Sequence, residues 1–248
     1  MEPAIAFRDV SYGIRGKKEV LHHFDLEVAA GETLVLLGRS GSGKTTALKL
    51  VNALLTPISG AVYVEGRPTR EWDPILLRRR IGYVIQESGL FPHYTVARNV
   101  AVVPRLVGWE PARIEARVDE LLSRVGLPPG EFRSRYPREL SGGQRQRVGV
   151  ARALAAEPSL LLMDEPFGAL DPVTRRDLQR EFLALRSTWT KTSLFVTHDV
   201  REALALATRI ALLHEGRLEI VSTPREFLAA KSGEARVFLA ALEDLPVA

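Results

Sequence analysis

The stretch Gly38-Arg39-Ser40-Gly41-Ser42-Gly43-Lys44-Thr45 matches the pattern G-x-x-x-x-G-K-[ST]. A short apolar run, Thr33–Leu37, precedes it and predicts a buried strand, while a helical pattern follows from Lys44 to about Leu55. Glycines let backbone N–H groups turn inward around a polyphosphate, and the helix N-terminus adds the positive end of its dipole. This context predicts a nucleotide-binding loop (the P-loop), to which we assign all eight residues and Thr46. Lys44 is expected to reach the β- and γ-phosphates, and the Thr45 hydroxyl to hold Mg²⁺.

A second glycine cluster, Leu140-Ser141-Gly142-Gly143-Gln144, runs into a helical pattern that extends to Ala156. Ser141 is a favourable N-cap, and the amides of Gly142 and Gly143 lie at a helix start, where an anion can bind. Taken alone, this segment (the signature loop, residues 140–144) is better explained as an ordinary capped helix.

A third segment, Leu160–Met163, is an apolar strand that ends in Asp164 and Glu165. In P-loop enzymes an aspartate at the end of a strand holds the metal, so Asp164 is the candidate Mg²⁺ ligand. Glu165 is then placed to take a proton from an attacking water, as a general base does. The simpler alternative is a strand that ends in polar residues.

The remaining pattern predicts an α/β fold, with a P-loop core, a mainly parallel sheet, an antiparallel β region at the N-terminus and an inserted helical subdomain. We expect a single domain over residues 1–248, with the core in about 1–86 and 157–248 and the helical subdomain in about 87–156. Helical stretches with breaks at Pro104 and Gly108–Pro111 support the insertion. The other expected elements are strands Ala4–Val10, Val20–Val28, Ile81–Ile85 and Ser193–Val196, helices Pro172–Leu185 and Arg201–Ala207, and a hairpin of Ile210–Leu213 and Leu218–Val221 around Glu215-Gly216.

Composition excludes several classes of protein. With 46% hydrophobic and 26% charged residues, the chain is an ordinary globular sequence. It has no cysteine, so disulfides, thiolate catalysis and cysteine-based metal sites are excluded. Charged residues near the start occupy the place where a signal peptide needs an apolar segment, so we expect no signal peptide. The longest uncharged stretch, residues 50–64, is too short to span a bilayer. Residues 67–152 carry an excess of basic residues, but no aromatic residues alternate with them, so we expect no nucleic-acid partner. Because we expect neither a signal peptide nor a membrane-spanning segment, we expect a cytoplasmic location.

The P-loop, the signature loop, the Asp164-Glu165 pair and His198 together resemble, in order and spacing, the nucleotide-binding subunits of ABC transporters. The resemblance extends from about Ile5 to Phe227. It implies an ATPase that uses ATP and Mg²⁺ and forms a head-to-tail dimer. ATP would lie between the P-loop of one chain and the signature-loop residues Ser141, Gly142, Gly143 and Gln144 of the other.

The resemblance also implies roles for single residues. Tyr12 resembles the aromatic residue that stacks on adenine, and Gln86 resembles the glutamine that reaches Mg²⁺ and the attacking water. His198 resembles the histidine that contacts the γ-phosphate and orients Glu165. Asp171 resembles the aspartate that links the two nucleotide sites of the dimer. The implied catalytic set is therefore Glu165, His198, Gln86 and Lys44, and the implied metal ligands are Thr45, Gln86 and Asp164.

A narrower resemblance lies in residues 81–109 and in Asp171-Pro172-Val173-Thr174-Arg175. Both segments are similar to ATPases of importers for quaternary amines such as glycine betaine, carnitine and choline. This implies three partners: a second ATPase subunit, integral-membrane permease subunits and an extracytoplasmic substrate-binding protein. The chain would then sit peripherally on the cytoplasmic side of the membrane. Several such relatives carry C-terminal CBS domains, for which we expect no room after Ala248.

Two alternatives remain open from the sequence. The first is an ABC transporter ATPase for another cargo, such as an amino acid, an oxyanion or a lipid. The second is a soluble ABC ATPase that acts on ribosomes or DNA. The second is disfavoured because the sequence shows a single ATPase unit and no long insertion between the P-loop and the signature loop.

Overall fold

The computed structural model describes residues 2–13, 19–86, 89–168, 170–187 and 191–243. The chain forms two compact units. The first unit consists of residues 1–77 and 192–248, and the second consists of residues 78–191. The chain passes from the first to the second within helix α2 (Pro74–Arg80). The subdomain predicted for residues 87–156 lies inside the second unit, and its boundaries stay a prediction.

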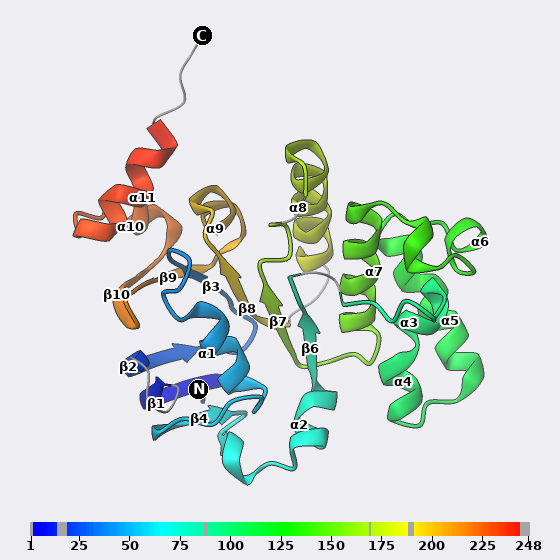
Figure 1. Ribbon diagram of the computed structural model, residues 1–248, viewed down its shortest axis with the longest axis horizontal. Helices are drawn as coiled ribbons and strands as arrows, with labels where there is room; N and C mark the ends of the chain where they lie inside the picture. Colours follow the sequence, from blue (N-terminus) through cyan, green and yellow to red (C-terminus); the bar gives the residue numbers. More distant parts are fainter. Residues whose placement is uncertain (1, 14–18, 87–88, 169, 188–190, 244–248) are drawn as a thin grey trace. The chain divides into compact units, whose positions relative to one another are not determined.

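The first sheet of the first unit is antiparallel, as the sequence predicted for the N-terminal region. Its strands follow the order β2-β1-β4-β5 (Figure 1) and are β1 (Ile5–Gly13), β2 (Glu19–Val28), β4 (Ser59–Val64) and β5 (Arg67–Pro68). Phe7 of β1 and Phe24 of β2 are buried and meet edge to face with ring centroids 5.0 Å apart. This aromatic pair helps to fix the register of the two longest strands.

The second sheet of the first unit carries the P-loop. Within this unit its strands follow the order β10-β9-β3-β8 and are β3 (Thr33–Leu37), β8 (Thr192–Thr197), β9 (Arg209–His214) and β10 (Arg217–Ser222). Strand β3 pairs in parallel with both β8 and β9, and every residue of β3 is buried. The predicted hairpin is confirmed: Glu215 and Gly216 connect β9 and β10 with φ angles of 44° and 78°, as a type I′ turn requires.

Four helices complete the first unit's core. They are α1 (Lys44–Val51), α9 (Val200–Leu206), α10 (Pro224–Leu228) and α11 (Gly233–Glu243). Helix α1 contacts β2, β4 and β8, and therefore packs between the two sheets (Figure 1), while α9 covers β3 and β8. The prediction that the first helix reaches about Leu55 was wrong. It ends at Val51, and Ala53 has a φ of 52°, which a right-handed helix does not allow.

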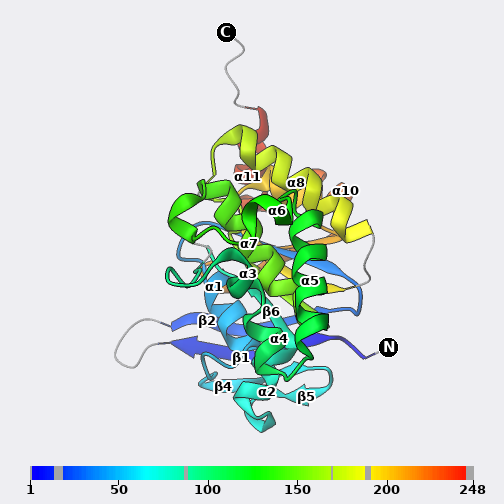
Figure 2. The same ribbon diagram turned by 90° about the vertical axis from the view of Figure 1, so that its right-hand side faces the viewer.

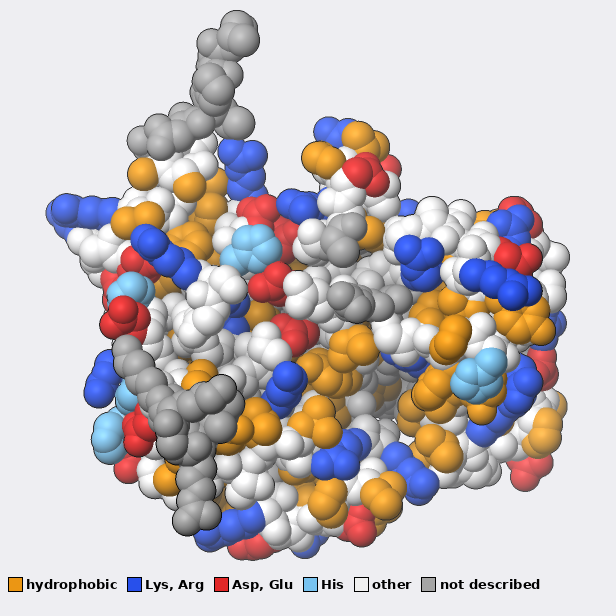
Figure 3. Space-filling view, viewed as in Figure 1, with side chains coloured by type: hydrophobic (Ala, Val, Ile, Leu, Met, Phe, Trp, Pro, Cys, Tyr) orange, Lys and Arg blue, Asp and Glu red, His pale blue; other side chains and the backbone are white. Residues whose placement is uncertain are grey.

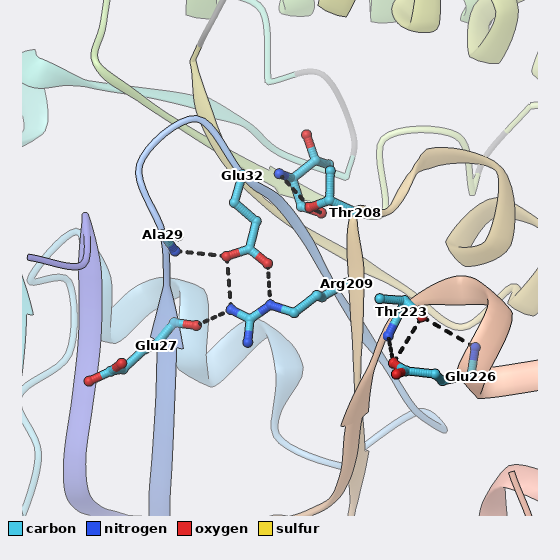
Figure 4. Close-up of polar contacts among 8 residues, drawn as sticks. Glu27, Ala29, Glu32, Thr208, Arg209, Thr223 and Glu226 are labelled. Carbon is cyan, nitrogen blue, oxygen red and sulfur yellow. Dashed lines mark hydrogen bonds and ion pairs between the residues drawn. The ribbon is translucent and has the colours of Figure 1, made fainter. Parts of the chain in front are cut away.

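An ion pair ties the two sheets of the first unit together (Figure 4). The carboxylate of Glu32, which precedes β3, accepts hydrogen bonds from Nε and Nη2 of Arg209 at 2.5 and 2.8 Å, and from the Ala29 amide at 2.7 Å. Arg209 Nη2 also donates to the carbonyl of Glu27 in β2 at 2.8 Å. The hydrogen bonds to Glu32 raise the pKa of Arg209 above its ordinary value. Figure 4 also shows the capping box of Thr223 and Glu226 at the start of α10.

The second unit is mainly helical around two strands. Strands β6 (Ile81–Val84) and β7 (Leu160–Asp164) pair in parallel. The helices are α3 (Val96–Val100), α4 (Val102–Leu106), α5 (Pro111–Arg124), α6 (Pro129–Phe132), α7 (Gly142–Leu154) and α8 (Pro172–Ser187). Helix α7 packs against β6, α3, α5 and α8, and Figure 2 shows α5 alongside it. The signature loop is therefore mounted on the central helix of this unit.

One predicted helix break is misplaced and one is confirmed. Pro104 lies inside α4, as the third residue after the N-cap Ala101, and the break falls at Ala101 instead. A proline is tolerated there because amides in the first turn of a helix have no intrahelical acceptor. The break at Gly108–Pro111 is confirmed: Gly108 has a φ of 78°, and α5 begins at Pro111.

Candidate nucleotide-binding site

The P-loop connects buried strand β3 to helix α1 in a backbone path that requires glycine. Gly43 is the N-cap of α1 and has a φ of 108°, and a Cβ there would lie 2.7 Å from Cδ2 of Leu21. A Cβ at Gly38 would lie 2.3 Å from the carbonyl oxygen of Leu213. Both positions are therefore restricted to glycine by close packing, and Gly43 also by its conformation. The loop is pressed against β2 on one side and β9 on the other.

Lys44 closes the loop. Its side chain is buried, and Nζ donates hydrogen bonds to the carbonyl oxygens of Gly38 at 2.8 Å and Arg39 at 2.7 Å. The first turn of α1 contains no acidic residue. A positive charge at the N-terminus of a helix, with no acidic side chain in the first turn, makes this end of α1 suited to an anion.

A cavity of about 480 Å³ lies beside the loop within the first unit. Residues 39–42 of the P-loop line it together with Val20, His22 and the turn of the β9–β10 hairpin. The amide of Gly216 in that turn donates to the Ser42 carbonyl at 3.1 Å, so the hairpin supports the loop from behind.

Tyr12 and His198 lie in the same unit as the P-loop. Tyr12 pairs with Leu21 across β1 and β2, and Leu21 is the residue that packs near Gly43. His198 follows β8 and is exposed. The turn that presents it is rigid, because the Thr197 hydroxyl donates to the buried Glu202 carboxylate at 2.5 Å and accepts from the Asp199 amide at 3.0 Å.

Asp164 and Glu165 lie in the second unit at the end of β7. Every residue of β7 is buried, including Asp164 at 6% exposure. Glu165 has a φ of 44°, which turns the chain sharply out of the strand. The structure brings Glu165 close to Gln86, whose Nε2 lies 3.5 Å from Glu165 Oε2, the long end of the hydrogen-bond range. Two of the predicted catalytic side chains therefore meet.

Sequence reasoning missed Tyr83, which hydrogen bonds to Asp164. Burial, the charge of Asp164 and this hydrogen bond raise the pKa of the Tyr83 hydroxyl above its ordinary value. The register of the sheet explains this contact. Tyr83 of β6 lies opposite Leu162 of β7, and Asp164 is two residues further along β7 on the same face of the sheet. A buried carboxylate thereby gains a donor that steadies its orientation.

The signature loop has the predicted cap. Ser141 is the N-cap of α7, its Oγ accepts from the Gln144 amide at 3.2 Å, and the Gln144 side chain accepts from the Ser141 amide at 2.9 Å. Ser141 and Gly142 are exposed, whereas Gly143 is buried. A Cβ at Gly143 would lie 2.5 Å from the Thr174 methyl group. Glycine is therefore needed at this position for packing, in addition to any role in binding.

Asp171 lies beside the same threonine. Its Oδ1 accepts from the amides of Val173 and Thr174, each at 3.1 Å, at the start of α8. Hydrogen bonds from Thr174 hold the pKa of Asp171 below its ordinary value. Thr174 thus connects Gly143 of the signature loop to Asp171, and sequence reasoning gave it no such role.

The predicted metal ligands belong to different units: Thr45 to the first, and Gln86 and Asp164 to the second. Across the part of the chain that the structure describes, no group of three or more His, Cys, Asp or Glu side chains could hold a metal. Asp164 supplies one buried carboxylate at the end of β7, and Mg²⁺ commonly takes one or two carboxylates and completes its shell with waters and substrate phosphates. In the same described part, no helix has the length and apolar character needed to cross a membrane.

A family model described as "ABC transporter" matches residues 21–168, a segment that contains the P-loop, the signature loop and the Asp164-Glu165 pair. The chain belongs to this family as an ATP-binding protein.

Among its relatives, the glycine betaine/carnitine/choline transport ATP-binding protein OpuCA of Bacillus subtilis is 50% identical over 93% of this chain and 60% of its own length. The glycine betaine uptake system ATP-binding protein YehX of Escherichia coli is 47% identical over 88% of this chain and 71% of its own. The chain thus spans about 60% of the curated relative OpuCA.

A solved structure with a similar backbone fold supports the architecture of this chain. It is described as a dimeric post-hydrolysis state of the ATP-binding cassette MJ0796 bound to ADP and Pi. It is 31% identical to this chain and covers 89% of it and 99% of its own chain, with a TM-score of 0.80. The α/β architecture predicted from the sequence is confirmed.

Proposed function

We propose that the chain is the ATP-hydrolysing subunit of an ABC importer for quaternary-amine solutes such as glycine betaine or choline. The observation that carries the ATPase assignment is the end of β7, where Glu165 follows the buried Asp164 and lies 3.5 Å from Gln86. A module that only bound nucleotide would have no need of a carboxylate and an amide held together at this point.

In this proposal the P-loop binds the ATP phosphates. Its amides and the Lys44 ammonium hold the β- and γ-phosphates, and Tyr12 stacks on the adenine. Thr45, Asp164 and Gln86 would hold Mg²⁺, which when bound would neutralise charge that develops on the phosphates. The residues assigned to the nucleotide are Tyr12, Gly38, Arg39, Ser40, Gly41, Ser42, Gly43, Lys44, Thr45 and Thr46.

Catalysis would consist of positioning and charge stabilisation. Glu165 takes the proton of the attacking water at its carboxylate, and Gln86 orients that water and the carboxylate together. His198 contacts the γ-phosphate from a turn that Thr197 and Glu202 hold fixed. Lys44 compensates the negative charge that accumulates on the transferred phosphoryl group.

The partner in hydrolysis would be a second ATPase subunit, most simply another copy of this chain. Ser141, Gly142, Gly143 and Gln144 would bind the nucleotide held by the partner's P-loop, which explains why an anion-binding helix start stands so far along the chain from the first. Asp171 would link the two nucleotide sites. The dimeric description of MJ0796 supports this arrangement.

The likeness to OpuCA and YehX supports permease subunits and an extracytoplasmic substrate-binding protein as further partners, and a place on the cytoplasmic side of the membrane. Hydrophobic side chains gather around a histidine over α3 and α4 (Figure 3). Phe91 and Leu106 of α4 are 41% and 56% exposed, and the ring centroids of Phe91 and His93 lie 6.1 Å apart. An exposed patch of this kind is suited to a protein partner, and we assign it to the permease.

The test compares Glu165→Gln with wild type and with a matched surface control, Glu131→Gln, whose carboxylate pairs only with Arg135 in the described contacts. Glu165→Gln should keep ATP binding and lose ATP turnover by about 10²–10⁴-fold, because an amide cannot accept the proton. Wild-type turnover in this variant would remove Glu165 as the base.

Uptake of labelled glycine betaine and choline by cells that carry wild type or Glu165→Gln tests the solute. Loss of uptake, with the variant still at the membrane, supports the quaternary-amine assignment. Unchanged uptake in cells without another importer rejects it, and leaves the ATPase assignment to be judged by turnover alone.

A further inference from the structure

One side chain of the P-loop reaches the last helix of the described chain. Arg39 donates from Nε to Oε1 of Glu234 at 2.5 Å and from Nη2 to Oε2 at 3.3 Å. The two residues are 195 positions apart in the sequence, and both belong to the first unit. Two parallel hydrogen bonds between a guanidinium and a carboxylate fix orientation as well as distance.

Glu234 is built into the structure and is no mobile surface group. Its side chain is only 8% exposed, whereas that of Arg39 is 60% exposed. It lies in the first turn of α11, and its amide donates to the Glu219 carboxylate of β10 at 3.0 Å. Nδ1 of His214 lies 3.6 Å from Glu234 Oε2. The carboxylate is therefore held in place before any ligand arrives.

The backbone of Arg39 contacts Lys44, the lysine proposed to bind phosphate. The Arg39 carbonyl accepts a hydrogen bond from Lys44 Nζ at 2.7 Å and another from the Ser42 amide at 3.2 Å. A side chain fixed by Glu234 thus belongs to the residue whose carbonyl closes the loop. Arg39 is therefore the single residue that links Glu234 to Lys44 through hydrogen bonds.

Charge gives the contact a second effect. Glu234 places a carboxylate beside a loop that would hold a polyanion, and a buried unpaired carboxylate is costly. Arg39 compensates Glu234 directly. Without Arg39, the carboxylate would repel the phosphates.

We propose that Glu234 is a positioning residue for the nucleotide: through Arg39 it holds the P-loop in its phosphate-binding form and makes the start of α11 responsive to nucleotide. The inference rests on the proposed function, because it assumes that the loop binds ATP. It assigns a role to the C-terminal helix and to the one long side chain among the variable positions of the loop.

The test is a double-mutant cycle on the full chain, with affinity for a fluorescent ATP analogue and Mg²⁺ as the readout. Arg39→Ala should weaken binding by about tenfold, because it removes both guanidinium hydrogen bonds to the Glu234 carboxylate, which then keeps only the longer contact with His214 among the contacts described above. Glu234→Gln should weaken binding less, and the double variant should bind more tightly than Arg39→Ala alone. The matched control is Arg236→Ala, an exposed cation on the same helix, which should leave affinity unchanged.

Hydrogen exchange at the α11 amides supplies a second readout. Nucleotide should increase protection of residues 234–237 in wild type and not in Glu234→Gln. Additive effects in the cycle, or equal protection in both proteins, would overturn the inference. Absence of nucleotide binding by folded wild type would instead reject the proposed function, so the two failures are distinguishable. Arg39→Lys, which keeps the charge but not the paired geometry, replaces Arg39→Ala if that variant does not fold.

Discussion

Replacing Glu32 with alanine should destabilise the first unit, because its carboxylate binds both Arg209 of β9 and the Ala29 amide in the turn before β3. It accepts from Arg209 at 2.5 and 2.8 Å and from the Ala29 amide at 2.7 Å, with only 8% of the side chain exposed. A hydrogen bond to a charged group contributes about 1.5–3 kcal/mol to the free energy of unfolding. The Arg209 side chain is 36% exposed, so water can replace part of what it loses. The net cost is therefore about 2–4 kcal/mol.

Urea denaturation measures this cost, with Glu27→Ala as the matched control. The Glu27 side chain is 49% exposed and pairs with Arg8 at the surface, so its loss should cost less than about 1 kcal/mol. Its backbone carbonyl still accepts from Arg209 in that variant. Arg209→Ala and the double variant complete a cycle, in which the two losses should not add. A cost below about 1 kcal/mol for Glu32→Ala, or full additivity, would refute the reasoning.

Two further predictions concern the signature loop and its neighbour. Gly143→Ala should destabilise the protein by about 1–3 kcal/mol, because the new Cβ would lie 2.5 Å from the Thr174 methyl group. Adding Thr174→Ser, which removes that methyl group, should restore the midpoint of urea denaturation. A midpoint that stays low in the double variant would contradict the steric cause. Because the pKa of Asp171 is lower in the folded protein than its ordinary value, its carboxylate stabilises the fold at pH values above the ordinary aspartate pKa. This contribution is lost as pH falls below about 4. Wild type should therefore lose more stability than Asp171→Asn between pH 5 and pH 3, and parallel profiles would exclude the effect.

The sequence predicted the parts of the fold where local pattern and burial agree. Strands β3 and β7 are continuous apolar runs that are wholly buried, and the glycine pattern after β3 leaves few other conformations for the P-loop. The Glu215-Gly216 turn was predictable because a type I′ turn needs residues that tolerate positive φ.

Short or weakly patterned elements escaped prediction. Strand β4 begins with exposed Ser59 and Gly60, and α6 and α10 are only 4 and 5 residues long. Helix α11 was also not predicted. Local periodicity cannot identify helices as short as α6 and α10, because tertiary contacts determine their conformation.

The roles assigned to the site residues stay predictions, but their places in the fold followed from the sequence. Asp164, Glu165 and Gln86 come at or directly after the ends of predicted strands. The partnership of Arg39 with Glu234 spans 195 positions and depends on how α11 packs. Contacts of this kind appear only once the chain is folded.

The position of Lys44 has a consequence for how the loop holds its shape. Its ammonium sits between the carbonyl oxygens of Gly38 and Arg39, and two carbonyl dipoles directed at one point repel each other unless a cation separates them. Lys44 therefore stabilises the conformation of the loop through the carbonyl groups of the loop itself. Much of the dehydration of the ammonium is completed when the chain folds, because Lys44 is buried. In the proposed function, a phosphate oxygen would therefore exchange with a carbonyl partner and need not displace a full shell of water.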